Sequence, residues 1–349
     1  MKTTHRIIFE NSDSMTGIPS DSVDLVVTSP PYPMIEMWDE MFSRQNQKIH
    51  EALNNQDGLQ AFELMHTELD AVWNEVRRIL KKGGFVCINI GDATRTLNGN
   101  FALYPNHSRV VSHMLGTGFT VLPEILWRKQ TNAPNKFMGS GMLPAGAYIT
   151  LEHEFILIFR KGEKREFKKN TDKIQRRKSS YFWEERNAWF SDIWTDLKGT
   201  SQNLFDSRTR KRSAAFPFEL PYRLINMFSV KGDTVLDPFL GIGTTAYAAM
   251  AACRNSVGYE LESGFRELIF SGADKIVPYS NERISKRIAG HLDFIKEKSN
   301  GNSGFRHINK NYNFPVVTQQ EKELIFNKLI SIDRNDDVIE IGYSDCPTD

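Results

Sequence analysis

Hydrophobic residues recur along the chain with two different periods, which predict helices in some segments and strands in others. Residues Leu59–Leu80 place apolar side chains three or four positions apart, the spacing of an amphipathic helix, and Lys81–Gly84 (KKGG) adds the basic charge and glycines typical of a helix end. Short runs rich in Val, Ile and Phe predict strands at Arg6–Asn11, Ser22–Ser29, Phe85–Ile90, Thr120–Trp127, Glu154–Phe159, Asp233–Leu236 and Ser256–Glu260. Further helices are expected at Ser108–Leu115, Phe218–Phe228, Thr244–Ala252 and Gln319–Ile330. Strands that alternate with helices indicate an α/β fold with a mainly parallel, doubly wound sheet covered by helices on both faces.

The composition is that of a globular protein from a reducing compartment. The 349 residues are 40% hydrophobic and 25% charged, and no apolar run is long enough to predict a membrane span. The first residues lack the apolar core of a secretory signal, and Cys87, Cys253 and Cys346 are too few and too scattered for a disulfide framework. A cytoplasmic protein is therefore expected. His153 and Glu154 are adjacent, but no H-E-x-x-H pattern or second cluster accompanies them, so no metal site is predicted and both are interpreted as local hydrogen-bonding residues.

Positive charge is concentrated in one segment of a nearly neutral chain. Residues 163–212 contain 14 lysine and arginine residues against 8 acidic residues, whereas the whole chain has a net charge of +1. Aromatic residues such as Tyr181, Trp183 and Trp194 are interleaved with them. A solvated loop is one interpretation, but cations mixed with aromatic rings favour a nucleic-acid surface. The candidate DNA contacts are Lys164, Lys168, Lys169, Arg176, Arg177, Lys178, Arg208 and Arg210.

The stretch VDLVVTSPPY, Val23–Tyr32, ends a predicted buried strand in two prolines. Proline donates no ladder hydrogen bond and restricts the residue before it, so the strand has to stop here. Taken alone, Ser-Pro-Pro-Tyr is consistent with a plain strand terminator. It also forms a rigid segment that presents the Ser29 hydroxyl, backbone carbonyls and the Tyr32 ring at the end of a strand.

The stretch TVLDPFLGIGTTAYAA, Thr234–Ala249, joins a strand to a helix through Gly241 and Gly243. Glycines let a backbone approach a ligand, and a helix N-terminus offers free amides. Glu260 ends the next predicted strand, where a carboxylate commonly binds ribose hydroxyls. Gly241, Gly243 and Ala246 with Glu260 also fit a loose dinucleotide fingerprint, so an NAD-type oxidoreductase is an alternative. That alternative leaves Ser-Pro-Pro-Tyr and the basic segment without a role.

Together the two stretches resemble the amino-methyltransferases of DNA, which use S-adenosylmethionine. The resemblance extends from Arg6 to about Ile269 and includes, in order, ILKKGGFVCINIGD, EHEFILIFRKG, AAFPFELPYRLI and SVGYELE. With the catalytic motif before the cofactor motif, the order is similar to the permuted beta group. The resemblance implies a Rossmann-like methyltransferase fold with a catalytic half in residues 1–162, an inserted DNA-recognition region in 163–212 and a cofactor-binding half in 213–298. Residues 299–349 form an extension to which no role is assigned.

The resemblance also implies roles for single residues. The catalytic loop corresponds to Ser29, Pro30, Pro31 and Tyr32. The S-adenosylmethionine site corresponds to Asp13, Thr28, Phe216, Pro217, Asp237, Pro238, Phe239, Gly241, Gly243, Thr244 and Glu260. For Asp13, a plain turn aspartate is the alternative.

The chemistry that these residues would perform is methyl transfer to an exocyclic amine of a base. Ser29 Oγ and the Pro30 carbonyl would accept its N–H groups and favour a pyramidal nitrogen with a free lone pair, while Tyr32 would stack on the base. The base must be flipped out of the duplex to reach them. A serine at the first position of the motif goes mainly with the N4 amine of cytosine, and an aspartate mainly with adenine.

The expected function is therefore a sequence-specific cytosine-N4 methyltransferase that acts on double-stranded DNA. It would protect host DNA from a cognate restriction endonuclease, which shares the recognition site but need not bind the protein. Two alternatives stay open: an adenine-N6 methyltransferase of the same fold, and a catalytically silent DNA-binding module.

Overall fold

The computed structural model describes residues 1–129, 138–197, 216–299 and 304–344. The strands are β1 (Lys2–Ile8), β2 (Val23–Thr28), β3 (Leu80–Ile90), β4 (Ala93–Leu97), β5 (Asn100–Tyr104), β6 (Phe119–Arg128), β7 (Met138–Gly139), β8 (Ala147–Tyr148), β9 (His153–Lys161), β10 (Ile193–Trp194), β11 (Thr234–Asp237), β12 (Asn255–Tyr259), β13 (His307–Ile308), β14 (Pro315–Val316), β15 (Leu329–Asn335) and β16 (Val338–Tyr343). The helices are α1 (Asp39–Gln45), α2 (Gln47–Asn54), α3 (Gly58–Ile79), α4 (Asn106–Gly116), α5 (Asn170–Lys178), α6 (Trp183–Trp189), α8 (Glu219–Phe228), α9 (Thr244–Ala251), α10 (Arg266–Ala273) and α11 (Ile276–Ser299). Short 3-10 helices are η1 (Glu36–Trp38), η2 (Ser263–Phe265) and η3 (Gln319–Glu323). Within these ranges, every helix is too short or too polar to span a bilayer.

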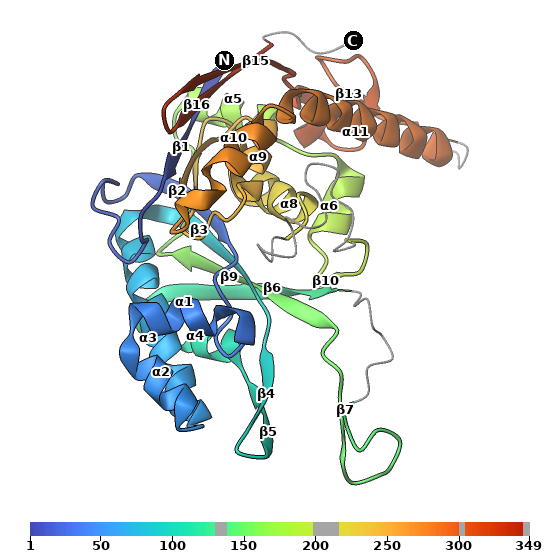
Figure 1. Ribbon diagram of the computed structural model, residues 1–349. Coiled ribbons are helices and arrows are strands. Elements are labelled where there is room, and N and C mark those ends of the chain that lie inside the picture. The colour runs from blue at the N-terminus through green and yellow to red at the C-terminus, as the bar shows by residue number, and fades with distance from the viewer. Residues whose placement is uncertain (130–137, 198–215, 300–303, 345–349) are drawn as a thin grey trace.

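A ten-stranded sheet forms the centre of the described structure, in the order β10-β6-β9-β3-β2-β11-β12-β1-β16-β15. The central strands β3, β2, β11, β12 and β1 are parallel to one another, whereas β9 and β16 run antiparallel to their neighbours. Helices α1–α4 cover one face of the sheet, and α8, α9 and α11 cover the other (Figure 1). The predicted α/β class, with a mainly parallel sheet between two layers of helices, is confirmed.

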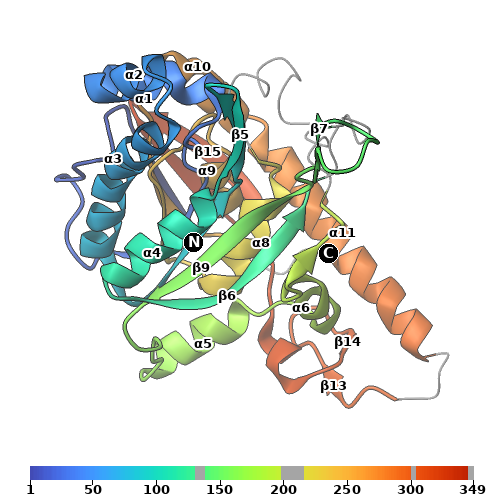
Figure 2. The same ribbon diagram turned by 90° about the horizontal axis from the view of Figure 1, so that it is seen from below.

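The parallel strands end at one edge of the sheet, which we call the carboxyl edge; the opposite edge is the amino edge. Two hairpins, β4–β5 and β7–β8, extend from the carboxyl edge at the bottom of Figure 1, and Figure 2 views the molecule from that side. The ring of Phe101 in one hairpin stacks on that of Tyr148 in the other, with centroids 4.3 Å apart. The carboxyl edge is therefore flanked by two hairpins in mutual contact.

The glycine pair of Lys81–Gly84 does not end α3, as the sequence had suggested. Strand β3 already begins at Leu80, and the pair lies inside it, where the pairing between β2 and β3 shifts register. Gly83 has φ +80°, and a Cβ on Gly84 would lie 2.8 Å from the Asp24 carbonyl oxygen. The glycines therefore permit a close, irregular approach of two strands. The helix expected at Gln319–Ile330 is also wrong, because η3 is short and β15 starts at Leu329.

The C-terminal residues belong to the central sheet. Strand β16 pairs antiparallel with β1, placing Thr3 opposite Ile341, and β15 then pairs with β16. Ile339, Ile341 and Tyr343 are buried in the same apolar cluster as residues of α8 and α9. The segment to which the sequence assigned no role thus covers the outer side of β1, and β1 and β12 separate it from β11, the strand that ends in Asp237.

Candidate active site

A buried aspartate joins the two loops that the sequence singled out. Strands β2 and β11 are neighbours in the sheet, so Thr28 and Asp237 end side by side at the carboxyl edge. Thr28 Oγ1 donates to Asp237 Oδ1 at 2.6 Å, Thr245 Oγ1 donates to Oδ2 at 2.6 Å, and the Phe239 amide donates to Oδ1 at 3.0 Å. Burial raises the pKa of Asp237 to about 6, against the effect of these hydrogen bonds. Asp237 therefore fixes the start of the Ser-Pro-Pro-Tyr segment against the glycine loop.

A hydrogen-bond network fixes the Ser29 hydroxyl. Tyr32 donates its phenol proton to Glu154 Oε2 at 3.0 Å, and Asn89 donates to the same carboxylate oxygen and to the Tyr32 oxygen, at 2.7 and 2.8 Å. Ser29 Oγ in turn donates to the Tyr32 oxygen at 3.1 Å. Lys129 Nζ lies 2.7 Å from the other oxygen of Glu154. Because the Ser29 proton points to Tyr32, the lone pairs of Ser29 Oγ are left to accept other hydrogen bonds.

The rest of the Ser-Pro-Pro-Tyr segment supports this geometry. Pro30 and Pro31 are buried and Tyr32 is half-buried. Burial, and then the charge of Glu154, raise the pKa of Tyr32 well above its ordinary value, so the ring stays a neutral phenol. A Cβ on Gly91 would lie 3.0 Å from the Tyr32 ring, so only glycine fits there without a shift.

Two residues of this network were not predicted as parts of the site. Glu154 was expected to form local hydrogen bonds, which it does, but its link to Tyr32 was not foreseen. Asn89 was not singled out, although it is the polar residue near the end of the apolar strand FVCINI. It is buried, and its Oδ1 has no partner among the described residues. A buried amide at a strand end is a signal that could have drawn attention to it.

The glycine loop leads into α9 and leaves room for a ligand. Gly243 has φ +90° and caps α9, where a Cβ would lie 3.0 Å from the Tyr247 ring. Gly241 has φ +55°, and no atom lies within 4 Å of where its Cβ would be. Its amide donates to Glu260 Oε2 at 2.7 Å, and the Glu262 amide donates to Oε1 at 2.8 Å. Burial raises the pKa of Glu260 to about 7. Each oxygen keeps capacity to accept from a ligand hydroxyl.

The remaining residues predicted for the cofactor lie in different settings. Pro238 is buried and Phe239 packs edge-on against Trp73, with centroids 5.9 Å apart. Thr244 is buried with no partner for Oγ1 among the described residues, whereas its neighbour Thr245, which was not predicted, bonds Asp237. The rotation of α9 from one residue to the next therefore directs Thr245, and not Thr244, toward Asp237.

The last three predicted cofactor residues lie on loops. Phe216 and Pro217 are buried immediately before α8. Asp13 is exposed in the turn after β1, where its carboxylate accepts from Asn11 Nδ2 at 2.8 Å. Strand β1 ends next to β12, so this turn lies at the same edge as Glu260.

The structure places the first part of the basic segment, residues 164–178, away from the Ser-Pro-Pro-Tyr loop, whereas β10 of the same segment pairs with the carboxyl end of β6. The six described candidates for DNA contact lie just after β9 or in α5, beside the start of β3. Arg165, a neighbour of these candidates, pairs with Asp233 at 2.7 Å and approaches Asp24 at 3.5 Å, and both aspartates lie at the amino ends of parallel strands. The six candidates are Lys164, Lys168, Lys169, Arg176, Arg177 and Lys178, and all lie at the amino edge. Arg208 and Arg210 lie outside the described residues.

The described residues contain no group of His, Cys, Asp and Glu side chains that could hold a metal ion.

Comparisons with known proteins match the region that contains both loops. The family model described as DNA methylase (N6_N4_Mtase) matches residues 23–271. The Type II methyltransferase M.MthZI of Methanothermobacter thermautotrophicus is 56% identical over 325 residues, which cover 93% of this chain and 90% of the relative. The Type II methyltransferase M.MjaI of Methanocaldococcus jannaschii is 51% identical over 278 residues, with 76% and 90% covered. Among solved structures, TTHA0409 of Thermus thermophilus in complex with S-adenosyl-L-methionine has 32% identity and a TM-score of 0.59, covering 76% of this chain and 91% of that protein. Since the family match spans both Ser29 and Asp237, the chain belongs to the DNA methylase family.

Proposed function

We propose that this DNA methyltransferase transfers a methyl group from S-adenosylmethionine to the exocyclic N4 of a flipped-out cytosine in double-stranded DNA. The observation that carries the proposal is the direction of the Ser29 hydrogen bond. Its proton is donated to Tyr32, so Ser29 Oγ can act as an acceptor at the carboxyl end of β2. An acceptor at that place is what an amine with two N–H groups requires.

The glycine loop fits S-adenosylmethionine, which supplies an electrophilic methyl group when bound. Glu260 would accept hydrogen bonds from the ribose hydroxyls, and the open backbone at Gly241 would let the ligand approach. Thr28, Asp237 and Phe239 would hold the loop in place. TTHA0409, which was solved with S-adenosyl-L-methionine, supports this assignment because it is similar over most of its length.

The Ser-Pro-Pro-Tyr segment would hold the target amine. Ser29 Oγ and the Pro30 carbonyl would each accept one N–H group, which favours a pyramidal nitrogen and frees its lone pair. The burial of Pro30 and Pro31 means that these oxygens are held by a rigid segment before the base arrives. We assign the face of the Tyr32 ring to stacking on the base, since its hydroxyl is already used by the network.

We assign cytosine as the target base because a serine stands first in the motif. We also propose that the protein is the protective methyltransferase of a restriction–modification system, because both relatives named above are Type II methyltransferases. Its partner is double-stranded DNA, at a site shared with a cognate restriction endonuclease.

Mass spectrometry of nucleosides tests the assignment. Genomic DNA is incubated with the purified protein and S-adenosylmethionine, with Ser29→Ala as the control. N4-methylcytosine in the wild-type reaction alone is the expected result. N6-methyladenine would keep the fold and the acceptor role but refute the choice of base. No modified base on DNA of varied sequence would favour a silent DNA-binding module.

A further inference from the structure

A basic groove crosses the amino edge of the sheet, away from the candidate active site. Its walls come from the start of β3, residues 164–168, α5, α6, the end of α8 and η3. Eleven lysine and arginine residues line it against four acidic residues. Lys82, Lys164, Lys173, Arg176 and Arg186 are exposed there, and none has a carboxylate at ion-pair distance in the described part of the chain. The groove therefore presents positive charge that the protein itself does not neutralise.

The groove and the Ser-Pro-Pro-Tyr loop lie at opposite ends of the same strands. Asp24, at the start of β2, lines the groove, whereas Thr28 ends β2 beside Asp237. Because a strand rises about 3.3 Å per residue, the five residue steps from Asp24 to Ser29 separate the groove from the loop by about 17 Å. In Figure 1, α5 lies at the top of the view and the β4–β5 and β7–β8 hairpins extend from the bottom. A duplex that delivers a base to the carboxyl edge leaves this groove free.

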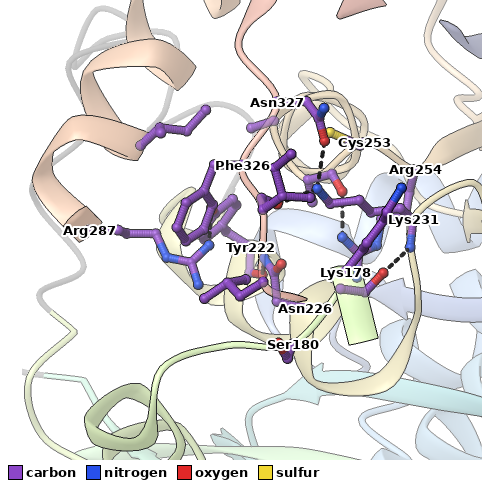
Figure 3. Close-up of a pocket in the computed structure, with 16 residues that line it drawn as sticks. Lys178, Ser180, Tyr222, Asn226, Lys231, Cys253, Arg254, Arg287, Phe326 and Asn327 are labelled. Atoms are coloured by element: carbon purple, nitrogen blue, oxygen red, sulfur yellow. Dashed lines mark hydrogen bonds between the residues drawn. The ribbon is translucent and has the colours of Figure 1, made fainter. Parts of the chain in front are cut away.

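Two buried cations reinforce the field of the groove. Lys231 and Arg254 line a small pocket (Figure 3) that shares Ser179, Ser180 and Asn226 with the groove. Lys231 Nζ donates to the Ile325 carbonyl and to Asn327 Oδ1, and within the described ranges neither cation has a carboxylate partner. The pocket has a volume of 20 Å³, room for about one water and too little for a phosphate. An anion drawn by these charges must therefore bind in the open groove.

Most aromatic rings of the groove pack against other side chains, and this packing limits the kinds of anion that the groove can bind; Phe190 is the exposed exception among the described residues. The guanidinium groups of Arg165 and Arg176 lie 4.9 and 4.7 Å from the centre of the Phe167 ring. Tyr181 packs against Trp189 and Phe190, with ring centroids 5.9 and 5.7 Å apart. Unpaired bases need free ring faces on which to stack. The groove thus offers cations for phosphates and few faces for single-stranded bases, which favours a duplex.

We propose that the groove binds the phosphate backbone of a second segment of double-stranded DNA, without sequence preference, while the carboxyl edge holds the target site. This inference rests on the proposed function, since it concerns DNA around a target. The contact would keep the enzyme on long DNA between target sites. It also gives the cations between Lys164 and Arg186 in the basic segment a DNA-binding role at the place where the structure puts them.

The test uses the triple variant Lys82→Ala/Lys173→Ala/Arg186→Ala, with one residue from each of three walls. The control is Lys48→Ala/Lys275→Ala/Lys286→Ala, which removes the same charge from exposed positions outside the groove. Binding of a labelled random-sequence duplex is measured against salt concentration. Each lost phosphate contact lowers the slope of log K against log salt by about 0.9, so the groove variant should lose about 2.7 and the control almost nothing. An equal slope in wild type and groove variant would overturn the proposal.

Methylation of genomic DNA then tests whether the groove contacts the target duplex itself or a second segment of DNA. The groove variant should match wild type on DNA sheared to short fragments and be several-fold slower on unsheared DNA. An equal loss on both would mean that the groove contacts the target duplex itself, which overturns the second-segment assignment. Stronger competition by single-stranded RNA than by duplex DNA would also overturn it. If wild type methylates no DNA, the proposed function fails, while the salt slope still decides whether the groove binds duplex.

Discussion

The raised pKa of Glu260 predicts that cofactor binding strengthens as the pH rises from about 6 to about 8. Burial raises the pKa of this carboxyl to about 7 in the free protein. An ionised carboxylate accepts hydrogen bonds from two ribose hydroxyls, whereas a protonated one must place its own proton on one of those contacts. The amides of Gly241 and Glu262, which donate to its two oxygens, also favour the ionised form. If Glu260 binds the ribose as proposed, the ionised form is therefore the one expected to bind.

The size of the effect follows from the fraction ionised. With a pKa of about 7, about one tenth of the free protein carries the Glu260 charge near pH 6, and about nine tenths near pH 8. The Kd for S-adenosylmethionine should therefore fall about tenfold over this range, which corresponds to about 1.4 kcal/mol.

The stability of the free protein should change in the opposite direction. Its folded state holds the proton between about pH 4.5 and 7, where the unfolded chain has lost it, so the free energy of unfolding falls as the pH rises through that window.

Isothermal titration calorimetry of S-adenosylmethionine, on wild type and Glu260→Gln at three pH values, checks the prediction. The glutamine keeps the shape of the side chain but does not titrate, and the amino group of the cofactor titrates in both proteins alike. The ratio of the two Kd values thus isolates Glu260. If wild type and Glu260→Gln share one pH dependence, the carboxylate is not the group that controls binding, and the reasoning is refuted.

Other perturbations test the loops directly. Ser29→Ala should lower kcat at least about 100-fold and leave the Kd for S-adenosylmethionine unchanged, because it removes the acceptor that we propose for the target amine; methyl-transfer kinetics and calorimetry check both. Thr245→Ala should lower the free energy of unfolding in urea by about 1–3 kcal/mol, because it removes a hydrogen bond to a buried carboxyl. Thr244→Ala should lower it by less than about 1 kcal/mol, and equal losses in the two variants would contradict the structure. Glu154→Gln should lower kcat strongly and leave Tm almost unchanged, because the amide can donate to Tyr32 and so turn the phenol proton toward Ser29. A normal kcat would show that the network has no part in the mechanism.

The central parallel strands and the two loops could be predicted because local patterns encode them. The apolar run at Ser22–Ser29 became β2, and Leu59–Leu80 became α3 within one residue at each end. The adjacency of Thr28 and Asp237 followed from two strand ends in one parallel sheet, although they are 209 residues apart.

Contacts between distant side chains could not be predicted from such patterns. Nothing near Asn89 or Glu154 in the sequence indicates that both contact Tyr32. The charge of residues 163–212 predicts an anionic partner, but not that residues 164–178 lie at the amino edge of the sheet. In the sequence, the glycines of Lys81–Gly84 look the same as glycines that end a helix. Their structural role is seen only in the register shift of β3 against β2.

The pairing of β1 with β16 has a consequence for how the molecule folds. Thr3 and Ile341 are adjacent in the sheet although 338 positions separate them, so this contact has a very high contact order. Loop-closure entropy has to be overcome before the pairing is formed, and until then β1 is an unpaired edge strand. During synthesis, β1 is made long before β16, so its outer side stays unpaired until β16 has been made. The side of the sheet next to Glu260 is therefore expected to be the slowest part to become protected against hydrogen exchange during refolding.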